Sequence, residues 1–172
     1  MNKFICSLIL LIVLLIPSTH AQNDMNYLVH ANIIFRFTKY VNWPDEKKSG
    51  DFIIGIVGNT PLYDNLKTFI VNKTVGNQKI VLRKFSSSSP VFDCHILFLS
   101  EHSNRYLKRV VNATARSSVL LVSEGEDLAQ RGACINFKVE NERLKLEINK
   151  NNIRERNLDV ANELLSLAVI VK

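Results

Sequence analysis

Few side chains in this sequence combine the type and spacing that catalysis or metal binding requires. The segment Gly55-Ile56-Val57-Gly58-Asn59-Thr60 follows an apolar run, where phosphate-binding turns occur. It lacks the third glycine of a dinucleotide fingerprint and the Gly-Lys-Ser/Thr ending of a P-loop. The histidines after residue 21, His30, His95 and His102, include no pair at the i, i+4 spacing of a helical zinc site. We therefore interpret the glycine segment as a tight turn and His95 as a hydrogen-bonded strand residue, and we expect no catalytic, cofactor or metal site.

The most distinctive cluster in the sequence is aromatic. It consists of Phe35, Phe37, Tyr40 and Trp43. The apolar spacing between Asp24 and Val41 predicts an amphipathic helix with Asp24 as its N-cap. Because positions 35, 37 and 40 cannot all face one core from a single helix, either the helix is buried on more than one side or part of it meets a partner. The four aromatic residues are therefore candidates for core packing and for partner binding.

Composition and charge narrow the class of protein. The 172 residues are 47% hydrophobic and 22% charged, which excludes a disordered tail, a collagen-like fibre and a disulfide-dense miniprotein. The formal net charge is +6, and the basic residues are interleaved with acidic ones along the chain. Such interleaving is typical of a solvated surface, so we do not expect nucleic acid as a partner.

The N-terminus has the organisation of a secretory signal peptide. An apolar run extends from Phe4 to Ile16, which is shorter than the roughly 20 residues of a membrane-spanning helix. Lys3 precedes the run, Pro17 follows it, and Thr19-His20-Ala21 offers small residues for cleavage. We predict a signal peptide at residues 1–21, cleavage before Gln22, a periplasmic location and one domain at residues 22–172.

Two cysteines, Cys94 and Cys134, remain after the predicted cleavage. An exported chain enters an oxidising compartment, where a pair of thiols can be joined. We treat both as candidate redox cysteines.

Strand-like and helix-like segments alternate along most of the chain, which favours an α/β fold with a mostly parallel sheet flanked by helices. A C-terminal β-hairpin and a terminal helix complete the prediction. The expected strands are 52–57, 79–85, 95–99 and 118–122, with the hairpin at 133–139 and 143–149. The expected helices are 24–41, 61–70, 104–115, a brief one near Leu128, a turn at 153–156 and the terminal helix at 158–171.

Seven segments, taken in order, resemble the YfiR family and together cover nearly all of the chain after residue 21. They are ANIIFRFTKYVNWP at 31–44, FIIGIVG at 52–58, CHILFLS at 94–100, VLLVS at 119–123, GACINF at 132–137, LEIN at 146–149 and LLSLA at 164–168.

The resemblance implies a periplasmic regulator and not an enzyme. Family members bind the periplasmic sensor part of an inner-membrane diguanylate cyclase and hold it inactive, which lowers cyclic di-GMP and disfavours biofilm. Redox state and an outer-membrane lipoprotein modulate that inhibitory binding, and members have been seen as dimers.

The sequence departs from the family pattern at its cysteines. Many relatives carry Gly-Gly-Met where this chain has Gly132-Ala133-Cys134, and the second cysteine that some relatives place shortly afterwards is missing. A Cys94–Cys134 bridge is disfavoured, because an intervening strand at 118–122 would separate the two Cα atoms by about two strand spacings, beyond the roughly 7 Å limit.

Two alternatives to a cyclase regulator stay open. The partner could be a sensor histidine kinase, since nothing in the sequence selects the output domain. The chain could also be a periplasmic small-ligand receptor that uses the crevice at the carboxyl ends of the strands, near Gly58–Thr60 and Ser100–His102.

Overall fold

The alternating apolar and amphipathic segments build a mixed α/β fold, as the sequence predicts. The computed structural model describes residues 19–172, with side chains from Tyr27 onward. The predicted signal peptide lies almost entirely outside the described residues, as does Cys6.

An eight-stranded sheet forms the centre of the fold, in the order β10-β8-β7-β6-β5-β2-β4-β3. The strands β4, β2, β5, β6 and β7 run parallel to one another, and β3 pairs antiparallel with β4. β7 and β8 form the predicted antiparallel hairpin, and β10 runs parallel to β8. The bounds are β2 (Phe52–Val57), β3 (Thr74–Val75), β4 (Gln78–Phe85), β5 (Ile96–Leu99), β6 (Leu120–Glu124), β7 (Ile135–Glu140), β8 (Arg143–Asn149) and β10 (Val169–Val171).

The direction of strand addition reverses between β2 and β5. The chain leaves β2 for β4 on one side and returns to β5 on the other, so that Val57 pairs with both Phe85 and Leu99. In open α/β sheets, the carboxyl ends of the strands at such a reversal border the crevice where ligands bind. The loops that follow β2 and β5 therefore lie where the sequence placed the alternative ligand site.

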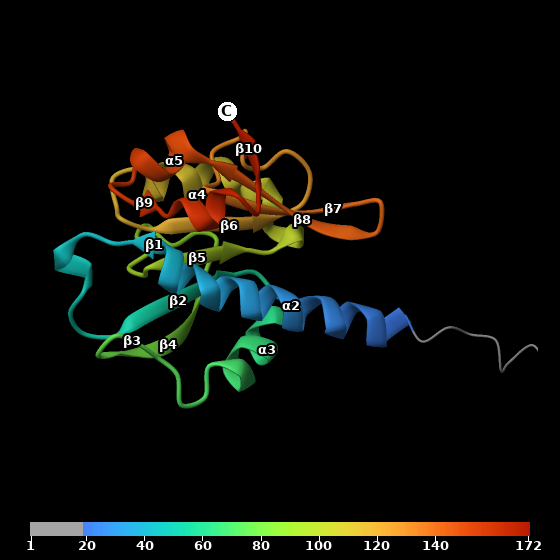
Figure 1. Cartoon of the computed structure of the whole chain (residues 1–172), viewed down its shortest axis with the longest axis horizontal. Helices are drawn as coiled ribbons and strands as arrows, with labels where there is room; N and C mark the ends of the chain where they lie inside the picture. The colour runs from blue at the N-terminus through green and yellow to red at the C-terminus, as the bar shows by residue number, and fades with distance from the viewer. Residues whose placement is uncertain (1–18) are drawn as a thin grey trace, which may run out of the picture.

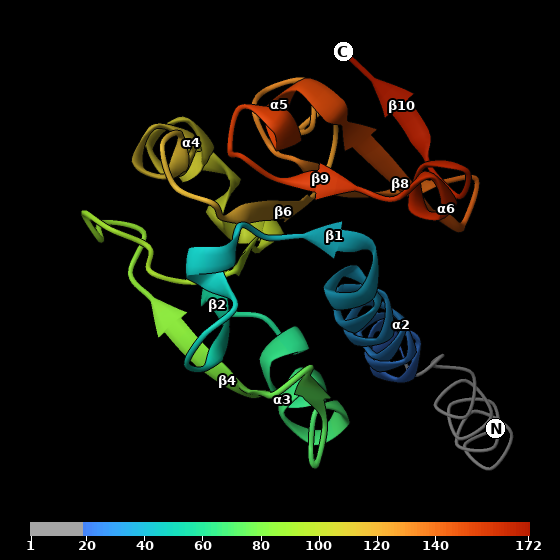
Figure 2. The same cartoon turned by 60° about the vertical axis from the view of Figure 1, so that its left-hand side comes forward.

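Helices cover both faces of the sheet. Helix α2 (Thr19–Tyr40) and helix α3 (Leu62–Phe69) lie on one face, whereas α4 (Leu107–Thr114) and α5 (Lys150–Arg154) lie on the other (Figure 2). A 3₁₀ turn, η2 (Glu101–Tyr106), leads into α4, and another, η1 (Asp45–Lys47), follows α2. Figure 1 shows that α2 and the β7–β8 hairpin extend in the same direction.

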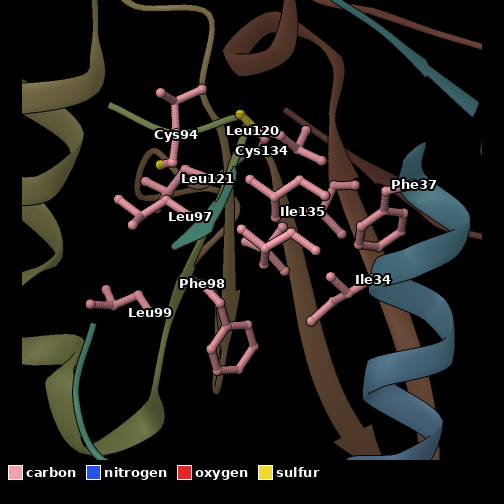
Figure 3. Packing of buried hydrophobic residues seen from close by; sticks show 14 of the residues in the cluster. Ile34, Phe37, Cys94, Leu97, Phe98, Leu99, Leu120, Leu121, Cys134 and Ile135 are labelled. Atoms are coloured by element: carbon pink, nitrogen blue, oxygen red, sulfur yellow. The ribbon is translucent and has the colours of Figure 1, made fainter. Parts of the chain in front are cut away.

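The core lies between the sheet and these helices. β5 and β6 are buried along their whole length, which explains why β5 is entirely apolar and β6 begins with three apolar residues in a row. Figure 3 shows side chains of β5, β6 and β7 packed together, with Ile34 and Phe37 of α2 facing them.

Two N-terminal and central predictions need correction. Helix α2 begins at Thr19, before the predicted N-cap Asp24, so Asp24 lies inside the helix. The chain near Leu128, expected to be a brief helix, forms hydrogen-bonded turns in which the Leu128 carbonyl accepts from the Arg131 and Ala133 amides. Leu128 itself is buried, so its apolar character serves packing.

The predicted terminal helix at 158–171 is wrong. The segment contains β9 (Asp159–Val160), a four-residue helix α6 (Asn162–Leu165) and β10. β9 pairs with β1 (Val41–Asn42) at the end of α2. The β-branched run Val169-Ile170-Val171 favours a strand and pairs with the edge of the sheet that β8 would otherwise leave open. This tertiary pairing outweighs the local preference for helix that the spacing of the preceding leucines indicates.

Candidate functional site: an apolar groove beside helix α2

Helix α2 presents three sides, and the first faces the sheet. Ala31, Ile34 and Phe37 form this side and are fully buried. The Phe37 ring stacks on Phe137 of β7 with centroids 6.3 Å apart. Phe37 is therefore a core residue, and a partner could not reach it while the helix stays docked.

The second side of α2 faces α3. The half-buried Phe35 meets Phe69 of α3 edge to face, with centroids 5.8 Å apart. The Lys73 ammonium lies over both rings, 5.7 Å from the Phe35 centroid and 4.6 Å from that of Phe69. Phe35 thus joins two helices, and burial of α2 on more than one side explains part of the aromatic cluster.

Trp43, just beyond the helix, is also a core residue. Its side chain is 5% exposed, its ring meets Phe52 edge to face at 5.1 Å, and its Nε1–H donates to the His95 carbonyl at 3.3 Å. His95 is hydrogen-bonded as predicted: Nδ1 accepts from the Ile53 amide at 3.0 Å, and Nε2 donates to the Lys47 carbonyl at 2.8 Å. Burial lowers the pKa of His95, which fits a neutral ring.

The third side of α2 is open and lines a groove of about 480 Å³. Six residues of α2 contribute to it, in two rows at i, i+4 spacing, and β8 and the C-terminal segment supply the opposite wall. The lining residues are Leu28, Val29, Asn32, Ile33, Arg36, Tyr40, Leu146, Leu164 and Leu167. We call this surface the α2 groove. Of the four aromatic candidates, Tyr40 is the one that lines it.

Large apolar side chains of the α2 groove are unusually exposed. The exposed fraction is 47% for Leu28, 43% for Val29 and 69% for Leu167. A second hollow of about 360 Å³ shares Ile33, Leu146 and Leu167 with the groove and reaches Val169 of β10. Contiguous exposed apolar surface of this kind marks a site of interaction with another molecule.

Charge in the α2 groove comes from Arg36. Its Nε–H donates to the Asn32 side-chain oxygen, one turn earlier, at 3.1 Å. This hydrogen bond holds the guanidinium along the helix while its remaining donors stay available to a carboxylate of a partner. The groove therefore combines an apolar floor with one positive charge.

The sequence pointed to Tyr40 but missed the leucines of the groove. Leu28 and Val29 are apolar residues of α2 that lie outside the stripe facing the core. Such extra apolar residues were the available signal in the sequence. Leu167 gave no such signal. The sequence placed it in a terminal helix, but α6 ends at Leu165 and Leu167 is exposed.

A separate cavity lies at the carboxyl ends of the parallel strands. The space directly between β2 and β5 is filled, because Gly58 (φ +94°) packs so closely that a Cβ there would lie 2.2 Å from the Ser100 and Ser103 hydroxyls. The open cavity, of about 470 Å³, lies beside this point. Its lining residues are Tyr27, His30, Pro61, Glu101, His102, Glu124, Gly125, Glu126, Phe137, Val139 and Leu144.

Both candidate redox cysteines are free thiols in the core. Cys94 lies two residues before β5, Cys134 immediately precedes β7, and β6 lies between those strands. Their thiols approach the carbonyls of Phe92 and Asn152, each at 3.7 Å. Burial raises the pKa of Cys94 to about 12 and also raises the pKa of Cys134, so both thiols are protonated.

The described residues, 19–172, also bear on metal binding and on membrane crossing. That part of the chain contains no group of three His, Cys, Asp or Glu side chains arranged to hold a metal ion. None of its helices combines the length and apolarity that crossing a membrane requires.

Residues 27–169 match the YfiR/HmsC-like family, and the chain belongs to that family. The match confirms the resemblance read from the seven sequence segments. Members are regulators associated with cyclic di-GMP signalling, so the coarse class of this chain is a regulatory protein. No curated protein shows a significant match to the chain.

Proposed function

We propose that this YfiR/HmsC-like protein is an exported regulator, active as the domain at residues 22–172. It docks through the α2 groove on the periplasmic sensor domain of an inner-membrane diguanylate cyclase and lowers the output of that enzyme. The exposed apolar lining of the groove carries the proposal, and family membership supports the kind of partner.

The energetics of the groove favour a protein partner. Leu28, Val29 and Leu167 expose large apolar side chains, and their burial would stabilise a complex by roughly 25 cal/mol per Å² of apolar area removed from water. Tyr40 adds an amphipathic ring, and Arg36 adds a charge with free donors. Tyrosine and arginine are enriched among the residues that dominate binding energy at interfaces.

Site-specific photocrosslinking in cells tests the docking surface. A photoreactive p-benzoylphenylalanine replaces Leu167 in the groove or, as a matched control, Val71, which is 60% exposed in the turn after α3. We expect Leu167 to crosslink to an inner-membrane protein that mass spectrometry identifies by its periplasmic sensor segment and cyclase domain. Val71 should not give that product.

The remaining partner hypotheses are separate outcomes of the same experiment. A sensor histidine kinase crosslinked at Leu167 would support docking through the groove but would replace the cyclase as the regulated enzyme. A second copy of the chain alone would assign the groove to a homodimer, and an outer-membrane lipoprotein would assign it to the second partner that the family resemblance implies. Equal crosslinking at Leu167 and Val71 would contradict docking through the groove.

A further inference from the structure

The cavity at the carboxyl ends of the strands has the setting of a ligand site. Its walls come from the described start of α2, the loops after β2 and β5, the end of β6 and the β7–β8 hairpin. Its volume of about 470 Å³ falls within the range of small-molecule pockets. The cavity also adjoins the reversal of strand order, where open α/β sheets bind ligands.

The charge around this cavity is negative. Glu101, Glu124 and Glu126 line it, and its lining includes neither lysine nor arginine among the described residues. The Lys138 ammonium lies 2.7 Å from Glu126 and offsets that one carboxylate from outside. His30 and His102 are the lining residues that could carry positive charge, so acidic side chains outnumber basic ones in the lining. The lining therefore favours a cation.

Glu124 is the most buried of the three carboxylates, with 9% of the residue exposed. Its Oε1 accepts from the Tyr27 hydroxyl at 3.3 Å and from the Glu101 amide at 3.0 Å. Both donors bind the same oxygen, so neither Tyr27 nor Glu101 occupies Oε2. Burial also raises the pKa of Glu124, as expected for a carboxylate short of compensating charge.

Aromatic and aliphatic side chains form the rest of the wall. The His30 ring lies 5.4 Å from Tyr27 and 4.3 Å from Phe137, centroid to centroid, and these three rings continue into Val139 and Leu144. A flat apolar body fits against this wall, and the negative faces of the rings attract a nearby cation.

From this geometry we propose that the cavity binds a small aromatic ammonium compound, with its ammonium group on Glu124 and its ring against Phe137 and Tyr27. The ammonium donates to Oε2, the oxygen that neither Tyr27 nor Glu101 occupies. The proposal concerns the isolated protein and does not depend on docking through the α2 groove.

Three ligands of nearly the same shape test this charge selectivity by titration calorimetry. Tyramine is an aromatic ammonium, tyrosol carries a hydroxyl in place of the ammonium, and 4-hydroxyphenylacetate carries a carboxylate. We expect saturable binding of tyramine at least about tenfold tighter than that of tyrosol, and no binding of the anion. Equal binding of tyramine and tyrosol, or no tyramine binding at about 10 mM, would overturn the proposal.

The Glu124→Gln variant tests the residue. Glutamine keeps the size of the side chain and an oxygen that can accept from Tyr27 and Glu101, so the fold should be retained. We expect the preference for tyramine over tyrosol to disappear in Glu124→Gln and to persist in Glu46→Gln, which removes an exposed charge in η1 away from the cavity. A folded Glu124→Gln protein that still prefers tyramine tenfold would contradict the assignment.

Discussion

The sheet-facing and groove-facing sides of α2 have similar apolar content but opposite surroundings. Ile34 and Phe37 are fully buried against the sheet, whereas Leu28 and Val29 remain nearly half exposed beside the C-terminal segment. The first side is covered within the chain, and the second is the side that we propose a partner covers. The difference separates residues that hold the fold from residues available for regulation.

A similar contrast holds between the α2 groove and the cavity at the strand ends. The α2 groove is apolar with one arginine, and it suits a protein surface. The cavity at the strand ends is lined by three glutamates and three aromatic rings, and it suits a small cation. Leu144 of β8 lines that cavity and also the hollow next to the groove.

The largest expected effect is the protection of the two buried cysteines from alkylation in the folded protein. We expect iodoacetamide to leave Cys94 and Cys134 unmodified in the native protein and to modify both in urea, because reaction requires opening that costs about 5–15 kcal/mol. Mass spectrometry at pH 8 measures the modification, with Val91→Cys, a site that is 67% exposed, as a reactive control. Rapid native modification of either buried thiol would contradict the closed core.

Alanine substitutions on the two sides of α2 sharpen the comparison. Phe37→Ala leaves a cavity against Phe137, and we expect it to lower the free energy of unfolding by about 3–5 kcal/mol. Tyr40→Ala removes a half-buried ring at the groove and should cost about 1 kcal/mol. Urea denaturation measures both, and similar losses for the two variants would show that Tyr40 also belongs to the core.

The smallest expected effect is a pH dependence from Glu124. Its pKa is raised above the ordinary value of 4.5, mainly by burial, so the folded state favours the protonated carboxyl. That contribution to stability is fully present below pH 4.5 and is lost as the pH rises through the raised pKa. The stability of Glu124→Gln relative to the unmodified chain should therefore increase between pH 4 and pH 7, as measured by thermal unfolding. An unchanged difference would contradict the raised pKa.

Local patterns in the sequence predict most of the fold. The apolar run at 52–57 matches β2, and the antiparallel hairpin follows from alternation around Leu144 and Leu146. The failures occur where tertiary partners decide. The leucines at 164–167 have helical spacing, but the free edge of β8 draws the next residues into β10.

The candidate site was less predictable, because exposure depends on contacts between distant segments. The sequence showed that Phe35, Phe37 and Tyr40 diverge around one helix, but it could not assign each ring to a neighbour. In the fold, Phe35 packs against α3, Phe37 packs against the sheet, and Tyr40 lines the α2 groove. Leu167 lies beside α2 because β9 pairs with β1 on one side of it and β10 pairs with β8 on the other.

Inhibition of the partner cyclase by groove variants tests the central claim most directly. Cyclic di-GMP synthesis is measured in membranes that contain the cyclase identified by crosslinking, with increasing amounts of purified protein. We predict that the Leu28→Asp/Leu167→Asp double variant, folded as judged by its urea midpoint, inhibits at least about tenfold less effectively than the unmodified chain. Val71→Asp should inhibit normally. Full inhibition by the folded double variant would contradict docking through the α2 groove.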